Sequence, residues 1–217
     1  MKNLVISVPR LEIHRPPIST AIVANVIKQA GYDVQALDLN INFLNHVGSH
    51  TAYYNFDQVW DGERSITEGE VKFIQDFLDK FTNKIEYYDR IWISVFGGSC
   101  HLFTELLCEH IRKHCSKKEI VLGGQGVLTY AIGLDKENFG DVMKEKGLCD
   151  IYIACLLYTS DAADDLTRVD LGGRRIIKKN VCSLCFENSS NCHWMSSLVN
   201  FLSISQRILS EPVSTPT

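Results

Sequence analysis

Short apolar runs rich in Val, Ile and Leu recur along residues 1–154, and this pattern is typical of strands buried in a sheet. The first run ends at Pro9, and the second ends at Asp38. The five predicted strands are residues 2–8, 34–37, 91–96, 119–122 and 150–153.

Between these runs, apolar residues recur at helical spacing. Ser19 or Thr20 can cap or open a first helix, and Gly31 is a natural stop for it. Further helices are predicted over residues 66–81, 101–114 and 135–146, the last one at the surface. Residues 39–65 are rich in Asn, His, Tyr and Gly, so we expect them to be the least regular part.

This alternation of strands and helices predicts an α/β fold, with a doubly wound, five-stranded parallel sheet and right-handed crossovers. The pattern ends with the fifth strand, so we expect a domain truncated there. Ligands of such sheets bind at the carboxyl ends of the strands. The glycines at positions 97, 98, 123, 124 and 126 fall at those ends. They either let the backbone approach a ligand closely or simply form tight turns.

Several motifs occur in a characteristic order at these ends. They are Pro-Pro-Ile-Ser-Thr-Ala at 16–21, Gly-Tyr-Asp-Val at 31–34, Asp38, Ser-Val-Phe at 94–96, Val-Leu-Gly-Gly at 121–124 and Cys-Asp-Ile-Tyr-Ile at 149–153. Together they resemble the N-terminal cobalamin-binding domain of B12-binding radical SAM proteins. The resemblance covers about residues 1–154.

The resemblance implies a flavodoxin-like (Rossmann-like) domain that holds a corrin ring across the carboxyl edge of its sheet. It implies that Ser94, Gly97 and Gly98 contact the nucleotide tail of the cofactor. It further implies that Gly123, Gly124 and Gln125 line the slot for this tail. Pro17 and Ser19, which belong to the motif that opens the first helix, complete the predicted cofactor contacts. No catalytic residue and no protein ligand to a metal is predicted.

One position departs from the family pattern. The family places an axial His two residues after the aspartate that ends the second strand, whereas this chain has Asn40 there, after Asp38. Either cobalamin binds without a protein imidazole on cobalt, which we favour, or the domain has lost the cofactor.

The other candidate ligands have simpler interpretations. His101, His110 and His114 lie on one predicted helix, and the last two have the spacing of a metal pair. No carboxylate or Cys set converges with them in the sequence, so we interpret them as a solvated face. The cysteines at 100, 108, 115 and 149 are expected to pack as small apolar groups.

The Cys-x-x-x-Cys-x-x-Cys motif of radical SAM enzymes does not occur in the sequence. The 4Fe-4S cluster and S-adenosylmethionine would therefore belong to a catalytic domain outside this chain. The fragment itself is then not expected to be catalytic, although its parent would be an enzyme.

Composition narrows the class of protein further. The 217 residues carry a net charge of −4, which gives no electrostatic basis for binding nucleic acid or an anionic membrane. No apolar run is long enough for a membrane span or a signal peptide. We therefore expect a cytoplasmic protein whose eight cysteines are thiols. Its oligomeric state stays open.

Residues 155–217 differ in texture, with many serines and no clear hydrophobic period. Residues 155–164 and 169–177 resemble the two fixed parts of a translated sequencing adapter, separated by an index-sized gap, and residues 178–180 its A-rich end. Cys182, Cys185, Cys192 and His193 suggest a zinc site, but their spacing is unlike a true knuckle. We interpret this segment as a non-native, poorly structured tail without a functional role.

The sequence thus favours a cobalamin-binding domain from a truncated radical SAM enzyme, either a methyltransferase or an enzyme of radical rearrangement. The alternative is a flavodoxin-like domain that binds no cofactor and serves as a structural or substrate-covering module. A nucleotide-binding or glycosyl-transfer domain would need a Gly-rich turn after the first strand, which residues 9–17 lack. The hypothesis of a metal-binding regulator is supported only by the cysteine-rich residues 155–217.

Overall fold

The computed structural model describes residues 1–9, 13, 17–130 and 137–154. The predictions for residues 155–217 lie outside the described residues. Within the described part, no helix is both long and apolar enough to cross a membrane.

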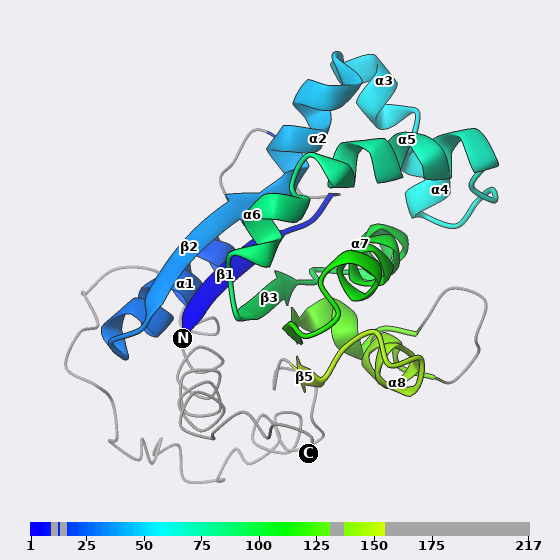
Figure 1. Cartoon of the computed structure of the whole chain (residues 1–217). Coiled ribbons are helices and arrows are strands. Elements are labelled where there is room, and N and C mark those ends of the chain that lie inside the picture. The colour runs from blue at the N-terminus through cyan, green and yellow to red at the C-terminus, as the bar shows by residue number, and fades with distance from the viewer. Residues whose placement is uncertain (10–12, 14–16, 131–136, 155–217) are drawn as a thin grey trace, which may run out of the picture. The chain divides into compact units, whose positions relative to one another are not determined.

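The centre of the domain is a parallel sheet of five strands (Figure 1). They are β1 (Lys2–Ser7), β2 (Asp33–Asp38), β3 (Arg90–Ser94), β4 (Glu119–Gly124) and β5 (Ile151–Ala154). The strand order β2-β1-β3-β4-β5 is that of the flavodoxin-like folds. The predicted fold class is therefore confirmed. Strand β3 ends at Ser94, two residues earlier than predicted.

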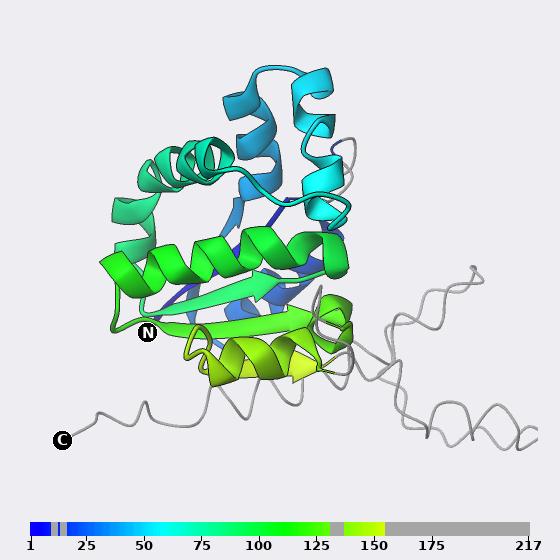
Figure 2. The same cartoon turned by 90° about the vertical axis from the view of Figure 1, so that its right-hand side faces the viewer.

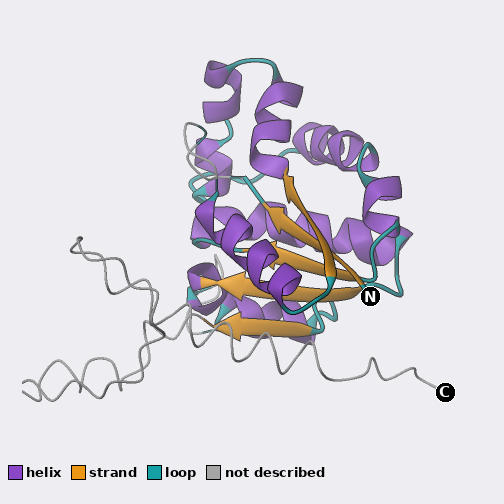
Figure 3. Ribbon diagram, turned by 90° about the vertical axis from the view of Figure 1, so that its left-hand side faces the viewer, coloured by secondary structure: helices purple, strands orange, loops and turns teal. Residues whose placement is uncertain are grey.

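Helices cover both faces of this sheet. Helix α1 (Ile18–Gln29) lies against β1 and β2 (Figure 3). Helix α7 (His101–His114) lies along β3 in Figure 2, and α8 (Phe139–Glu145) contacts β5. The main core forms where α7 meets the sheet, because alternate strand residues such as Ile6, Ile93 and Leu122 point to that face.

Helix α1 begins earlier than predicted. Pro17 is its N-cap residue, without a side-chain capping bond, and Ser19 and Thr20 lie inside its first turn. Of the prediction that Ser19 or Thr20 caps or opens the helix, capping is wrong, while both residues do lie at the start of the helix. Proline has no N–H and a fixed φ, so it can stand at a helix start where no amide partner is needed.

Residues 39–65, expected to be the least regular part, contain three short helices that the sequence pattern did not predict. These are α2 (Leu39–Val47), α3 (His50–Tyr54) and α4 (Asp57–Trp60). Their core is an aromatic cluster around Phe43, whose ring makes edge contacts with the rings of Tyr53, Phe56, Trp60, Phe73, Phe77 and Phe103. Tertiary packing of this kind stabilises helices that are too short to form alone.

The predicted helix at 66–81 is observed as α5 (Glu68–Asp79), and a short α6 (Thr82–Glu86) follows it. Thr67 and Glu70 form a capping box that fixes the start of α5. The Arg64 guanidinium bonds both oxygens of Glu70 and holds the pKa of this carboxyl at about 2.

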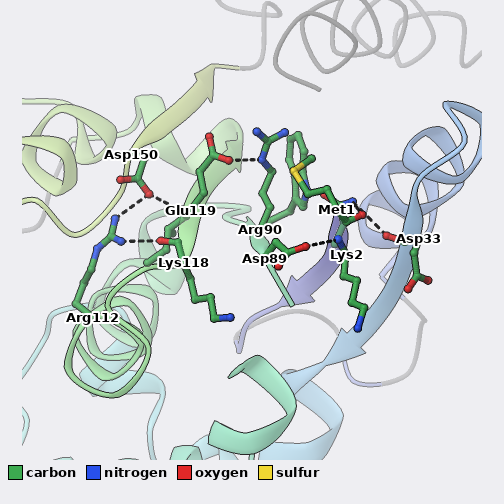
Figure 4. A network of polar contacts seen from close by, with 12 residues as sticks. Met1, Lys2, Asp33, Asp89, Arg90, Arg112, Lys118, Glu119 and Asp150 are labelled. Atoms are coloured by element: carbon green, nitrogen blue, oxygen red, sulfur yellow. Dashed lines mark hydrogen bonds and ion pairs between the residues drawn. The ribbon is translucent and has the colours of Figure 1, made fainter. Parts of the chain in front are cut away.

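Charged side chains gather at the amino ends of the strands (Figure 4). The buried guanidinium of Arg90 pairs with Glu119 at 2.5 Å, joining the first residues of β3 and β4. Arg112 of α7 bonds Asp150 before β5 at 2.9 Å and the Lys118 carbonyl before β4 at 2.8 Å. These contacts stabilise the amino ends of the strands, and they lie at the opposite edge of the sheet from the carboxyl ends.

Candidate functional site

The carboxyl ends of four strands form one continuous edge. Ser7 at the end of β1 pairs in register with Asp38 of β2 and with Ser94 of β3, and Ser94 pairs with Gly123 of β4. The predicted site residues all lie at this edge or at the start of α1. Ser94 ends β3, Gly123 and Gly124 are the last two residues of β4, and Gln125 follows them. Gly97 and Gly98 follow β3, and Pro17 and Ser19 stand at the start of α1.

The hydroxyl groups of Ser19 and Ser94 meet at 3.1 Å. This contact joins the helix that follows β1 to the end of β3, and these two strands are neighbours in the sheet. The chain order reverses between β1 and β3, which makes this the topological switch point where ligands of flavodoxin-like sheets bind. The structure thus brings two separately predicted residues together at the expected place.

Next to Ser19, the buried Thr20 hydroxyl has no hydrogen-bond partner among the described residues. A hydroxyl left in this state costs free energy unless another polar group satisfies it. The first amides of a helix also lack intrahelical acceptors, and the positive end of the helix dipole attracts an anion. Within the described part of the chain, the start of α1 therefore combines amides that lack intrahelical acceptors with an unpartnered hydroxyl.

Gly97 and Gly98 expose backbone that the fold itself does not require to be glycine. A Cβ built on either residue meets no atom of the described residues within 4 Å. Gly97 has φ −162°, an extended conformation open to any residue. Neither packing nor backbone strain explains these two glycines, whereas a ligand lying over the short 3-10 helix Gly98–Cys100 would explain both.

The turn after β4 has a different reason for its glycines. Gly124 has φ +118°, and a Cβ there would lie 2.3 Å from the Val95 carbonyl oxygen. The same oxygen accepts the amide of Gly126 at 2.9 Å, and Val95 donates to the Gly123 carbonyl at 2.7 Å. This turn packs on the segment after β3, so the fold alone demands Gly124.

Exposed apolar side chains border the pair of serines. Ile18 precedes Ser19 and is 69% exposed, while Phe96 follows Ser94 by two residues and is 55% exposed. A shallow depression of about 360 Å³ on α1 is lined by Pro17, Ile18, Ala21, Ile22 and Asn25. Apolar walls with a few fixed polar groups are the usual surroundings of a bulky organic ligand.

Asn40, at the family's axial-ligand position, lies in the core. Asp38 caps α2, where one carboxylate oxygen accepts the amides of Asn40 and Ile41 and the Ser7 hydroxyl at 3.0–3.2 Å. Only 2% of Asn40 is exposed, and its side-chain oxygen accepts the Tyr53 hydroxyl. In this structure position 40 supplies no ligand to the edge of the sheet.

His101 of α7 contacts the turn after β4. Its ring stacks on Phe139 with centroids 3.9 Å apart, and its Nε2 lies 2.8 Å from the Gly126 carbonyl and 3.0 Å from the Thr129 hydroxyl. Burial lowers the pKa of His101, so a neutral ring with Nε2–H can donate to that carbonyl. Sequence reasoning missed this role because the contact joins distant parts of the chain.

The predicted solvated face is wrong for two of its three histidines. His101 is 3% exposed and His110 is 7% exposed, and only His114 is open to solvent. The prediction for the cysteines is confirmed, because those at 100, 108, 115 and 149 are all free and buried.

Comparisons with known proteins give little beyond the fold. No family model matches the chain, and no curated protein matches it. Among the solved structures that the chain resembles are two azoreductases. The azoreductase AzrA shares 12% identity at a TM-score of 0.42, and an azoreductase from Bacillus anthracis str. Sterne shares 13% at 0.40. Each match covers 95% of this chain and 100% of the other. Such low scores assign no function, and neither structure is a cobalamin-binding domain by name.

Proposed function

We propose that residues 1–154 form a cofactor-binding domain that holds a corrinoid at the switch point between β1 and β3. The observation that carries the proposal is the open backbone of Gly97 and Gly98 beside the Ser19–Ser94 pair. A flat, bulky ligand needs backbone without side chains, and these two glycines have no structural reason to be there.

Two further features fit the parts of a corrinoid. The exposed Ile18 and Phe96 offer apolar surface to the ring, while Ser94 offers a small hydroxyl to the nucleotide tail. The tail carries a phosphate, and the free amides and the Thr20 hydroxyl at the start of α1 are suitable partners for an anion.

The burial of Asn40 restricts how cobalt could be held. Because Asn40 bonds Tyr53 inside the core, the proposed mode is binding without a protein side chain on cobalt from this position. In an intact relative, cobalt would relay a methyl group or assist a radical rearrangement. The domain would bind and orient the cofactor, and a separate iron–sulfur domain with S-adenosylmethionine would carry the chemistry.

The test is a titration of the purified full chain with hydroxocobalamin, followed by absorbance and by co-elution on gel filtration. The expected result is a shifted corrinoid spectrum and co-elution. Gly97→Leu should weaken binding at least tenfold without unfolding the protein. Gly69→Leu is the matched control, because a Cβ at Gly69 on α5 also meets open space but lies away from the edge.

Absence of both a spectral change and co-elution would overturn the proposal in favour of a domain that binds no cofactor. Equal binding by Gly97→Leu would overturn the proposed location. A parallel titration with flavin mononucleotide, which flavodoxin-like sheets hold at the same switch point, separates the two cofactor classes. Binding of the flavin alone would contradict the corrinoid proposal.

The proposed parent enzyme is tested at the level of the gene. Sequencing the genomic region downstream of codon 154 is expected to show a Cys-x-x-x-Cys-x-x-Cys motif. Adapter bases at codons 155–177 would confirm that the tail is non-native. A continuous genomic reading frame through those codons would refute that interpretation.

A further inference from the structure

A second group of potential ligands lies far from the candidate site, where the ends of α5 and α7 meet. Asp79 is the last residue of α5, and His110 and His114 occupy the end of α7. One ligand atom from each of the three residues lies within 4.8 Å of the others. Asp79 is distant in the sequence, so only the packing of the two helices reveals this group.

The spacing of these atoms is suited to a shared ion. His110 Nδ1 lies 3.9 Å from Asp79 Oδ1, which is too long for a direct hydrogen bond. Two ligands of a tetrahedral zinc ion lie about 3.3 Å apart when each bond is about 2.0–2.1 Å. Asp79 and His114 are exposed, so small rotations of their side chains close the remaining gap.

Thr82, the first residue of α6, fixes the second nitrogen of His110. Its hydroxyl lies 2.8 Å from His110 Nε2. When Nε2–H donates to this hydroxyl, Nδ1 presents its lone pair toward Asp79. A hydrogen bond from the non-ligating nitrogen is the usual way in which proteins orient a metal-binding histidine.

The ends of two helices favour a cation at this group of side chains. Both α5 and α7 end here, and unpaired carbonyls at helix C-termini attract positive charge. Lys113 opposes a cation, and the Asp79 carboxylate offsets that charge.

We propose that Asp79, His110 and His114 form a binding site for a divalent transition-metal ion of the zinc class. Two imidazoles and one carboxylate are ligands that zinc accepts, and three protein ligands leave a position for water. The ion would join α5 to α7 roughly 20 Å along α7 from the candidate cofactor site at the other end of this helix. The proposal is independent of the corrinoid.

The experiment measures binding of Zn²⁺ by calorimetry and of Co²⁺ by visible absorption, using the full chain without a histidine tag. A Cys182→Ser/Cys185→Ser background removes the thiol pair of the tail from the measurement. We expect one ion per chain in this background. The cobalt spectrum should contain d–d bands without thiolate charge transfer, because the proposed ligands hold no sulfur.

Asp79→Asn and His114→Ala should each weaken binding at least tenfold, and both change exposed side chains that the core does not need. Thr82→Val should weaken it about tenfold by freeing the His110 ring. Asp76→Asn on the same helix is the matched control and should bind like the parent. Absence of binding in the background protein would overturn the proposal. Equal affinity in Asp79→Asn and His114→Ala would do the same, as would an equal loss in Asp76→Asn.

Discussion

Replacing Gly124 with alanine should destabilise the domain strongly, whereas the same change at Gly97 should not. The Cβ added at position 124 would lie 2.3 Å from the Val95 carbonyl oxygen, at a φ of +118° that side chains rarely adopt. The carbonyl cannot turn away freely, because it accepts the amide of Gly126. The mutation therefore forces the turn after β4 to move or to lose this bond.

The size of the effect follows from two costs. With φ +118° and ψ 177°, position 124 lies in a backbone region that is essentially restricted to glycine, and a residue with a Cβ there costs about 1–3 kcal/mol. Overpacking costs about 1–3 kcal/mol more, which gives about 2–6 kcal/mol together. Domains of this size are stable by about 5–15 kcal/mol. A loss near 3 kcal/mol should lower Tm by about 6–12 °C. Gly97→Ala, with open space around its Cβ, should stay within about 0.5 kcal/mol of the parent.

Thermal and urea unfolding of the full chain, followed by circular dichroism, measures both variants side by side. A wild-type midpoint for Gly124→Ala would refute the reasoning, because the close approach to Val95 would then have no energetic consequence. Equal destabilisation by Gly97→Ala would refute the view that this glycine is free of a structural role. It would also weaken the case for a ligand there.

Three other predictions concern stability and thiol chemistry. Asp38→Ala should lower the free energy of unfolding by about 1–2 kcal/mol in urea titrations, because it removes the cap of α2. The Glu70 carboxyl has its pKa lowered from 4.5 to about 2, so its contribution to stability is complete above pH 4.5 and lost as the pH falls toward 2. Replacing Arg64 with methionine should therefore flatten the dependence of the urea midpoint on pH in this window. Burial raises the pKa of Cys149 to about 11 and that of Cys108 as well, so both thiols should resist iodoacetamide at neutral pH in the folded protein, as measured by peptide mass spectrometry.

A control variant or a contradicting result tests each of these three predictions. Asp38→Ser keeps a capping oxygen and should retain most of the stability, and a loss equal to that of alanine would contradict the capping role. Glu68→Gln changes an exposed carboxyl on the same helix and should leave the acid dependence unchanged. Rapid labelling of Cys149 in the native protein, at the rate seen in urea, would contradict its burial.

The β-strands and the edge they share could be predicted because buried parallel strands are continuous apolar runs that need little context. The same pattern placed Ser94, Gly97 and Gly98 at the carboxyl ends. The helices of residues 39–65 could not be predicted in this way, since each is short. Their stability comes from the packing of Phe43 and its aromatic neighbours, which lie on several elements.

The roles of single residues also divide into those that the sequence predicts and those that only the fold reveals. The sequence by itself determined the strand order along the chain, the glycines at the strand ends and the absence of an axial histidine after Asp38. Only the tertiary structure decided that Asn40 is a core residue, that Gly124 is required by the Val95 carbonyl, and that Asp79 meets two histidines. The physical reason is range: strand propensity is local to a few residues, whereas burial, close approach and ligand convergence depend on segments that meet only when the chain folds.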